Sequence, residues 1–198
     1  ADSALGPWPP LWLALENGHP AAALLLVEAG ANVNSPLKDS ISPFHFAVNV
    51  KEHDLALTML AHGADPDSRY YTRRPIHTAL MHKNLPLVQA LLKAGSRLEM
   101  MPNDNEPPLF AAFHNADTSF VYCILRAGAD PNATNIAGEP LLHSLIRIGR
   151  LEALPIALDI GTDVNIRDIQ GRTARDIAVR QELKSVVDLL DQAGATSK

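Results

Sequence analysis

A motif that returns about every 33 residues constrains the fold of this chain more than any other feature of the sequence. A proline followed by an apolar residue opens five copies, at Pro10, Pro43, Pro75, Pro108 and Pro140, and a sixth, degenerate copy follows them. A glycine keeps the same period. Two independent markers in phase predict a tandem-repeat protein, in which units stack on their neighbours instead of sharing one central core. These glycines are Gly30, Gly63, Gly95, Gly128, Gly161 and Gly194.

The second copy shows what one unit contains. Ser42 can cap a helix, and Pro43 suits its first position because the φ of proline is already helical and its missing N–H has no partner there. Residues 51–54 are polar and predict a turn, and a second apolar helix ends at Gly63, which supplies a left-handed cap. A turn-rich connector leads to Pro75. Since such a helix pair is too short to bury its own apolar face, the sequence predicts an all-α solenoid of stacked helix–turn–helix units joined by hairpin loops.

These motifs resemble those of the ankyrin-repeat family. The family's helix opening, Thr-Pro-Leu-His-x-Ala, is matched at 42–47 and 74–79, and its Gly-Ala-Asp-x-Asn run is matched at 30–34, 63–67, 128–132 and 161–165. The resemblance covers residues 8–194, and it implies a single domain of six repeats. Because the chain lacks an initiator methionine and begins almost on a repeat, we interpret it as a piece of a larger protein. We place the repeats at 7–35, 36–67, 68–99, 100–132, 133–165 and 166–194.

Composition argues against several classes of protein. The formal net charge is −5, whereas general binding to nucleic acids or anionic membranes needs clustered lysine and arginine. Cys123 is the one cysteine, so the chain forms no internal disulfide, and this fits a reducing, intracellular and cytoplasmic location. No run of about 18 apolar residues is present, so we expect no transmembrane span.

The sequence also argues against catalysis and metal binding. It shows no nucleophile–base set and no glycine-rich phosphate loop. His45 and His77 occupy the fourth position of the helix opening, where the resemblance implies hydrogen bonds to the hairpin backbone. They lie one repeat apart, roughly 8–10 Å, which is too far for one shared metal ion. We expect Cys123 to be buried and inert because it lies within an apolar helical segment, residues 121–125. The chain is therefore predicted to have no enzymatic activity, no cofactor and no metal site.

The connector before repeat three departs most from the family pattern. Tyr70 and Tyr71 stand among three cations, Arg69, Arg73 and Arg74. One interpretation is a solvated loop whose tyrosines pack on a neighbouring hairpin. The other is an anchor for a protein partner with acidic character, because tyrosine and arginine are enriched in binding hot spots and arginine pairs with carboxylates.

Three further departures carry expectations. Pro155 falls inside the second helix of repeat five, where it costs roughly 3 kcal/mol, so we expect that helix to be kinked, shortened or shifted. Trp8 and Trp12 make repeat one unusually apolar for an end repeat, so its surface either packs on something upstream or is exposed here. Met100 and Met101 would extend the tyrosine connector into an adaptable apolar patch.

The resemblance implies that a partner binds along the concave surface formed by hairpin tips and first helices. His82, His114 and His143 are placed near the exposed side of the first helices, where they are either solvated or line this groove. By motif position the surface also includes Asn49, Val50, Thr78 and Asn115. The candidate partner-binding residues are Phe46, Tyr70, Tyr71, Arg73, Arg74, Met81, His82, Met101, Asp104, His114 and Arg147.

The sequence therefore predicts a protein–protein interaction module or scaffold that binds a peptide or folded protein and is monomeric as an isolated domain. The alternative is a structural spacer or intramolecular packing domain within a larger enzyme, channel or trafficking protein, and the apolar first repeat favours this somewhat. A third prediction concerns Asn165. The run that ends there looks like the Leu…Asp-Val-Asn context in which an asparaginyl hydroxylase modifies ankyrin repeats, so Asn165 is a candidate hydroxylation site.

Overall fold

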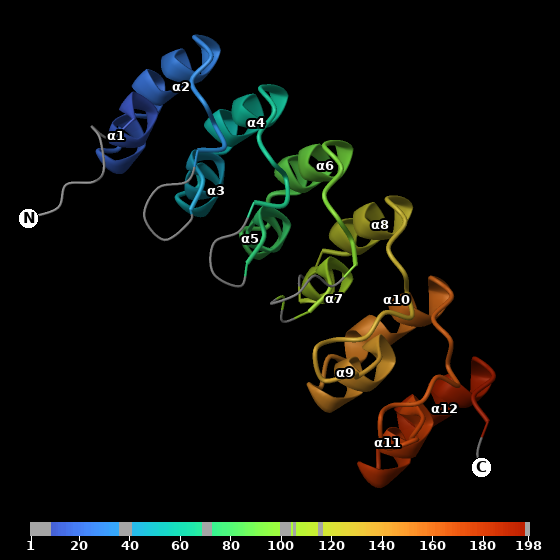
Figure 1. The fold of residues 1–198 in the computed structure, drawn as a ribbon. Coiled ribbons are helices and arrows are strands. Elements are labelled where there is room, and N and C mark those ends of the chain that lie inside the picture. The colour runs from blue at the N-terminus through green and yellow to red at the C-terminus, as the bar shows by residue number, and fades with distance from the viewer. Residues whose placement is uncertain are drawn as a thin grey trace, which may run out of the picture. The chain divides into compact units, whose positions relative to one another are not determined.

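The computed structural model describes residues 9–35, 41–68, 73–99, 104, 106–114 and 117–196 (Figure 1). By its internal contacts the chain divides into two compact units. Unit 1 is Ala1–Arg97 and unit 2 is Leu98–Lys198. Over the described ranges the regular structure is helical, and Thr134 and Pro140 form an isolated antiparallel β-bridge. The predicted all-α architecture of helix–turn–helix units is confirmed.

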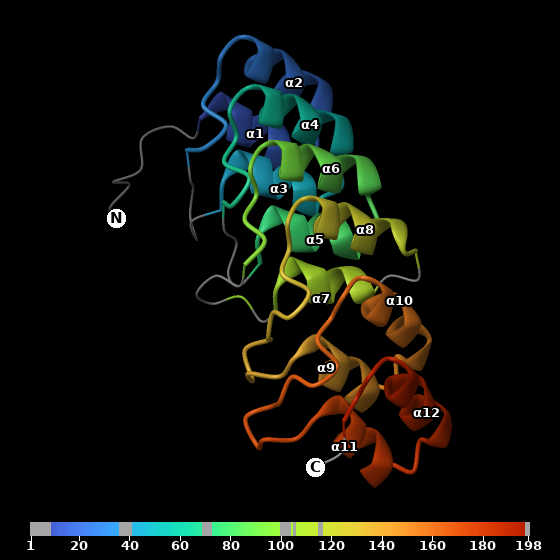
Figure 2. The same ribbon diagram turned by 90° about the vertical axis from the view of Figure 1, so that its right-hand side faces the viewer.

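In unit 1 the helices form two layers. The first helix of each pair packs against its own second helix and against the first helix of the next pair, so α1, α3 and α5 make one layer (Figures 1 and 2). The second helices α2, α4 and α6 stack in the same order to make the other layer. The helices are α1 (Pro10–Glu16), α2 (Pro20–Glu28), α3 (Pro43–Asn49), α4 (His53–Ala61), α5 (Pro75–Met81) and α6 (Leu85–Lys93).

The apolar stripes of these short helices meet between the layers. Phe44 and Val48 of α3 and Met59 of α4 are fully buried, as are the small residues Ala47 and Ala56 on the same two helices. Alanine at these positions allows the two helix backbones to approach closely, and the larger side chains fill the space around them. Each pair thus completes its core only with its neighbours, as the repeat pattern predicts.

Local backbone chemistry begins and ends the helices as expected. The Ser42 hydroxyl accepts a hydrogen bond from the backbone N–H of His45 at 3.1 Å, and Pro43 occupies the first turn of α3. Gly63, with φ of 81°, adopts the left-handed conformation that follows α4. Lys51 adopts the same region with φ of 67° at the turn between α3 and α4, where a side chain is sterically disfavoured.

Unit 2 repeats the arrangement with one irregular pair. α9 packs against α10 and α11, and each of α7 and α11 packs against its own second helix. Pro155 lies in the first turn of α10, which is only six residues long and follows a 3-10 helix at Leu151–Ala153. The predicted disturbance at Pro155 is confirmed, because the second helix of this repeat is split and shortened. The helices are α7 (Pro108–Phe113), α8 (Ser119–Arg126), α9 (Leu141–Arg147), α10 (Leu154–Asp159), α11 (Ala174–Arg180) and α12 (Lys184–Gln192).

The start of α9 differs from the predicted repeat. Pro140 is the N-cap, and Leu141 takes the first helical position that proline holds in α3 and α5. This shift by one residue brings His143 to the place that corresponds to His45. The prediction that His143 lies near the exposed side is wrong, since the side chain is completely buried and its Nε2 lies 2.8 Å from the carbonyl oxygen of Arg172.

Trp12 is an interior residue of repeat one rather than an exposed apolar one. Its indole N–H donates to the carbonyl oxygen of Ser35 at 3.2 Å, and its ring packs edge-on against Phe46 with centroids 5.4 Å apart. Trp12 and Ser35 are 23 positions apart in the sequence. His45 and Ser68 are also 23 positions apart, and His45 Nδ1 lies 3.1 Å from the carbonyl oxygen of Ser68. Trp12 thus takes the place of the motif histidine in repeat one. Trp8 lies outside the described residues.

Asparagine side chains tie successive hairpins together. The Asn34 amide donates to the carbonyl oxygen of Gly63 at 2.8 Å and accepts from the backbone N–H of Asp65 at 2.8 Å. In unit 2 the Asn132 side chain accepts from the backbone N–H of Asp163 at 2.7 Å. These bonds satisfy backbone groups of the connectors and so hold neighbouring repeats in register.

Candidate functional site

The tyrosine-rich connector lies mostly outside the described residues. Tyr70 and Tyr71 fall there, and so do Met101 and Asn115. The structure therefore leaves their predicted role in partner binding untested. Of the three arginines in this connector, Arg73 and Arg74 are described, and the structure places them differently.

Arg74 is in the interior of unit 1. Its side chain is 0% exposed, and its Nη1 donates to Asp67 Oδ1 at 3.3 Å and to the carbonyl oxygen of Arg97 at 2.7 Å. Asp67 also accepts from the hydroxyl of Ser96 at 3.0 Å. The prediction that Arg74 is a surface contact for a partner is wrong, because its guanidinium is used to join three segments of the same unit.

Asp104 is also buried, with 1% of its surface exposed. A carboxylate at this depth does not present itself to a partner, so its predicted place on the binding surface is wrong as well. Thr78, at 1% exposure, is buried on the inner side of α5. The sequence motif assigned both side chains to the exposed binding surface, whereas both are buried in the structure.

The first helices of unit 1 carry a row of exposed apolar side chains. Leu13 is 46% exposed at α1, Val50 is 46% exposed at the end of α3, and Met81 is 53% exposed at the end of α5. Phe46 is half-buried beside them, and Nη1 of Arg73 lies 3.6 Å from the sulfur of Met81. We call these five residues the α1/α3/α5 face. Sequence reasoning missed Leu13, although it holds the same place after Pro10 that Phe46 holds after Pro43.

His82 lies beside this face and is half-buried. Its ring centroid is 6.4 Å from that of His53, in an edge-to-face arrangement. Burial lowers the pKa of His82, and the nearby Lys51 and His53 lower it further. The neutral form of His82 is therefore favoured at pH 7, so this histidine adds little positive charge to the face.

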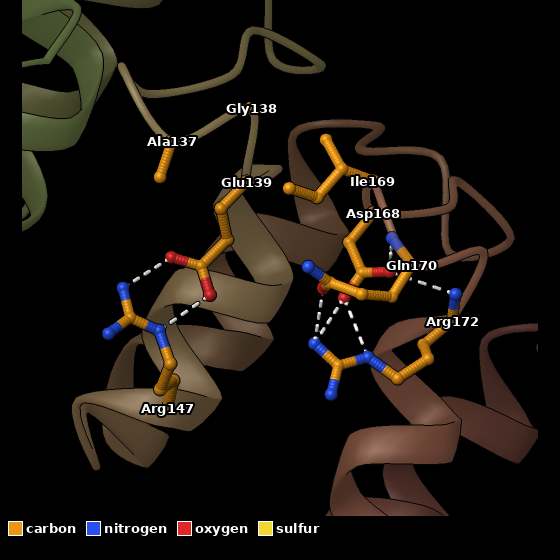
Figure 3. A pocket seen from close by; sticks show the side chains of 8 residues that line it. All are labelled: Ala137, Gly138, Glu139, Arg147, Asp168, Ile169, Gln170 and Arg172. Carbon is orange, nitrogen blue, oxygen red and sulfur yellow. Dashed lines mark hydrogen bonds and ion pairs between the residues drawn. The ribbon is translucent and has the colours of Figure 1, made fainter.

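In unit 2 the hairpins before α9 and α11 enclose a pocket of about 240 Å³ (Figure 3). Arg147 donates to Glu139 with two nitrogens, Nε at 2.7 Å and Nη2 at 2.5 Å, and Arg172 donates to Asp168 from Nε at 2.8 Å. The Ile169 side chain extends from its hairpin toward Glu139 and the hairpin of Gly138 (Figure 3). The wall contains Gly138, where a Cβ would lie only 2.8 Å from Cγ2 of Ile169.

The charges of this pocket are already neutralised within unit 2. Burial by itself raises the pKa of Glu139, but the hydrogen bond and the charge of Arg147 outweigh it and hold that pKa below its usual value. The same balance, with Arg172 as the donor, lowers the pKa of Asp168. Arg147 is 57% exposed as predicted, yet a partner's carboxylate would have to compete with Glu139 for it.

His114 is exposed at the end of α7, as the motif predicts. Its Nδ1 lies 3.4 Å from Oε1 of Glu106. Burial raises the pKa of Glu106, and the neighbouring His114 opposes this shift. The pair therefore joins the segment before α7 to the C-cap residue of that helix.

The same arrangement of helix pairs and hairpins is found in known proteins. A family model for ankyrin repeats, in three copies, matches residues 11–104. The crystal structure of the ankyrin repeat domain of Bcl-3, a unique member of the IkappaB protein family, superposes with a TM-score of 0.82 and covers 100% of this chain and 89% of that one, at 24% identity. The chain belongs to the ankyrin-repeat family.

Its ankyrin repeats are also similar to segments of much longer proteins. Human B-cell lymphoma 3 protein is 30% identical over 201 residues, which cover 96% of this chain and 43% of that protein. The putative palmitoyltransferase ZDHHC13 of Danio rerio is 23% identical over 171 residues, which cover 82% of this chain and 25% of that protein. The chain thus spans less than half the length of either relative.

The candidate hydroxylation site Asn165 is part of the ankyrin hairpin ladder. Its side chain accepts from the backbone N–H of Thr196 at 2.8 Å and donates to the carbonyl oxygen of Gly194 at 3.2 Å. It is the counterpart of Asn34 in unit 1. Whether this asparagine is modified stays a prediction, and access to it would require these bonds to open.

The ankyrin fold is generally non-catalytic. Cys123 is half-buried rather than fully buried, and burial raises the pKa of its thiol, with Arg126 opposing the shift. Among the described residues, three or more metal-ligating side chains nowhere converge. Within the same residues we find no helix whose length and apolarity would let it span a bilayer.

Proposed function

We propose that this chain is a protein-interaction module and that the α1/α3/α5 face of unit 1 is its binding surface. The observation that carries the proposal is the row of exposed apolar side chains, Leu13, Val50 and Met81, one on each of three helices that stack in sequence. Single exposed apolar residues are ordinary, whereas exposed apolar residues on three neighbouring helices of one layer favour an interaction site. Ankyrin repeats act as protein-interaction modules, which supports the proposal.

The face suits a segment of a partner protein that lies across successive repeats. Met81 is flexible and polarizable and adapts to varied partner side chains. Arg73, beside Met81, is an exposed cation of the described part of the connector and would pair with a carboxylate of the partner. The acidic character predicted for the partner therefore rests on Arg73 and not on Arg74. We propose that the isolated domain is a monomer that uses this face for a different protein.

A matched pair of variants tests the proposal. Met81→Glu places a carboxylate in the face, whereas Leu25→Glu makes the same kind of change on α2, where Leu25 is 67% exposed in the other layer. Proteins captured from a cell lysate by the chain should be retained by Leu25→Glu and lost with Met81→Glu and with Val50→Glu. Equal capture by all variants would remove the face from consideration. No specific capture by any of them would favour the spacer alternative.

A further inference from the structure

A small pocket at one end of the α1/α3/α5 face combines an apolar floor with uncompensated negative charge. It has a volume of about 240 Å³ and lies between the end of α1 and the end of α3. Leu15, Phe46 and Val50 supply apolar surface. A volume below the roughly 300–1,000 Å³ of small-molecule sites suits one side chain of a partner better than a free ligand.

Two carboxylates flank this floor. Glu16 is the last residue of α1 and is exposed, and Glu52 is the half-buried N-cap residue of α4. Neither carboxylate is hydrogen-bonded or ion-paired to any residue in the part of the chain that the structure describes. His19 is the other titratable residue of the lining. The two carboxylates make the pocket negatively charged, so it attracts a cation.

We propose that this pocket binds a lysine or arginine side chain from an extended segment of the partner. Such a side chain has an aliphatic stem, which would lie on Phe46 and Val50, and a charged head, which would reach Glu16 and Glu52. An aliphatic side chain alone would cover the floor but would remove water from the carboxylates without replacing it, which is unfavourable. A carboxylate would be repelled. The proposal rests on the proposed function and adds the chemistry of the partner.

The rest of the face limits where the next anchor of that segment lies. Met81 is on α5, the first helix after α3, and neighbouring packed helices are about 8–10 Å apart. An extended chain advances about 3.3 Å per residue, so the basic side chain and the one that meets Met81 are roughly two to three residues apart. Arg73 beside Met81 would then meet an acidic residue, so opposite charges at the two ends fix the direction of the segment.

Peptide libraries test this with the full 198-residue chain. Four immobilised libraries would carry a fixed central lysine, arginine, norleucine or glutamate, with the remaining positions varied. We expect the lysine and arginine libraries to retain about tenfold more protein than the norleucine library, and the glutamate library to retain least. With the best lysine peptide, the methyl NMR signals of Leu15 and Val50 should shift.

Two double variants with the same change of net charge complete the test. Glu16→Gln/Glu52→Gln should abolish the preference for a basic residue, whereas Glu28→Gln/Glu182→Gln, at exposed positions outside the pocket, should keep it. Equal retention of the norleucine and lysine libraries, an unchanged preference after Glu16→Gln/Glu52→Gln, or no retention by any library would each overturn the pocket proposal. If Met81→Glu still abolishes partner capture in those cases, the proposed function stands. If it does not, both proposals fail.

Discussion

Unit 1 has eight acidic and eight basic residues, whereas unit 2 has fourteen acidic and nine basic residues and so carries the whole net charge of −5. Histidine is distributed in the opposite way, since six of the eight lie in unit 1. Both units build stacked helix pairs. The two units therefore form the same arrangement of helices with different numbers of charged residues and histidines.

The placement of arginine makes the contrast concrete. Unit 1 buries the guanidinium of Arg74 completely against Asp67 and the backbone of the next connector. In unit 2, Arg147 and Arg172 are at the surface. Arg147 donates to both carboxylate oxygens of Glu139, and Arg172 donates with two nitrogens to Oδ2 of Asp168. Removal of one member from a buried ion pair leaves an uncompensated charge, while exposed pairs contribute little. The two units should therefore respond very differently to loss of an arginine.

The largest effect is expected from Arg74→Ala. This change leaves Asp67 without its buried cation and should lower the free energy of unfolding by about 3–5 kcal/mol. Arg147→Ala, in unit 2, should cost only about 0.2–1 kcal/mol because Arg147 is largely exposed. Urea titration followed by circular dichroism measures both. If both variants lost the same free energy of unfolding, the burial of Arg74 would not explain a difference between the two units.

Acidification should also destabilise unit 1 through His45. Burial lowers the pKa of His45 to about 4, although its contact with the Ser68 carbonyl opposes the shift. The unfolded chain binds a proton near pH 6.5 and the folded chain only near pH 4, so stability is lost as pH falls between these values. The loss amounts to about 3 kcal/mol.

Replacement of the histidine isolates this contribution. His45→Gln removes the titrating group, so the variant should lose about 3 kcal/mol less than the parent between pH 7 and pH 4, whatever its stability at pH 7. Urea titrations at several pH values in that range give the free energy of unfolding of the parent and of the variant, and the parent should lose more of it as pH falls. Parallel pH profiles for the parent and the variant would contradict the assignment.

A smaller effect should be shared by the two units. Asn34→Ala removes two hydrogen bonds between hairpins of unit 1, and Asn165→Ala removes their counterparts in unit 2. Each change leaves backbone groups without a partner at a partly exposed site and should cost about 1–2 kcal/mol. Similar costs would mean that the ladder is common to both units. Hydrogen exchange at the backbone N–H groups of Asp65 and Thr196 reports each site separately.

The features that the sequence predicted correctly depend on the chemistry of a single residue. Ser42 caps a helix, Gly63 adopts a left-handed conformation, and Pro155 shortens a helix because each acts on its own backbone. The period of the repeat then places the helices. None of this requires knowledge of which side chains meet across the fold.

The depth of side chains was harder to predict because it depends on partners elsewhere in the chain. Arg74 is buried by its bonds to Asp67 and Arg97, and the sequence of the connector alone gives no sign of this. His143 shows a second cause. Gly149 lies nine positions after Pro140, whereas Lys51 lies eight positions after Pro43, and one extra residue turns a helix by about 100°. Counting from the turn instead of the proline would have placed His143 correctly.

The smallest expected effect concerns Glu139 in unit 2. Burial alone raises its pKa, but Arg147 and Asn135 hold the pKa below its usual value, so the group stabilises the fold above its unfolded pKa and loses this contribution as pH falls. Glu139→Gln should therefore cost about 0.2–1 kcal/mol at pH 7 and almost nothing at pH 3, as urea titrations at the two pH values would show. Since the variant also frees Arg147, it should bind an acidic peptide more tightly than the parent. A larger loss of stability, comparable with that of Arg74→Ala, would mean that unit 2 depends on its surface ion pairs as strongly as unit 1 depends on its buried one.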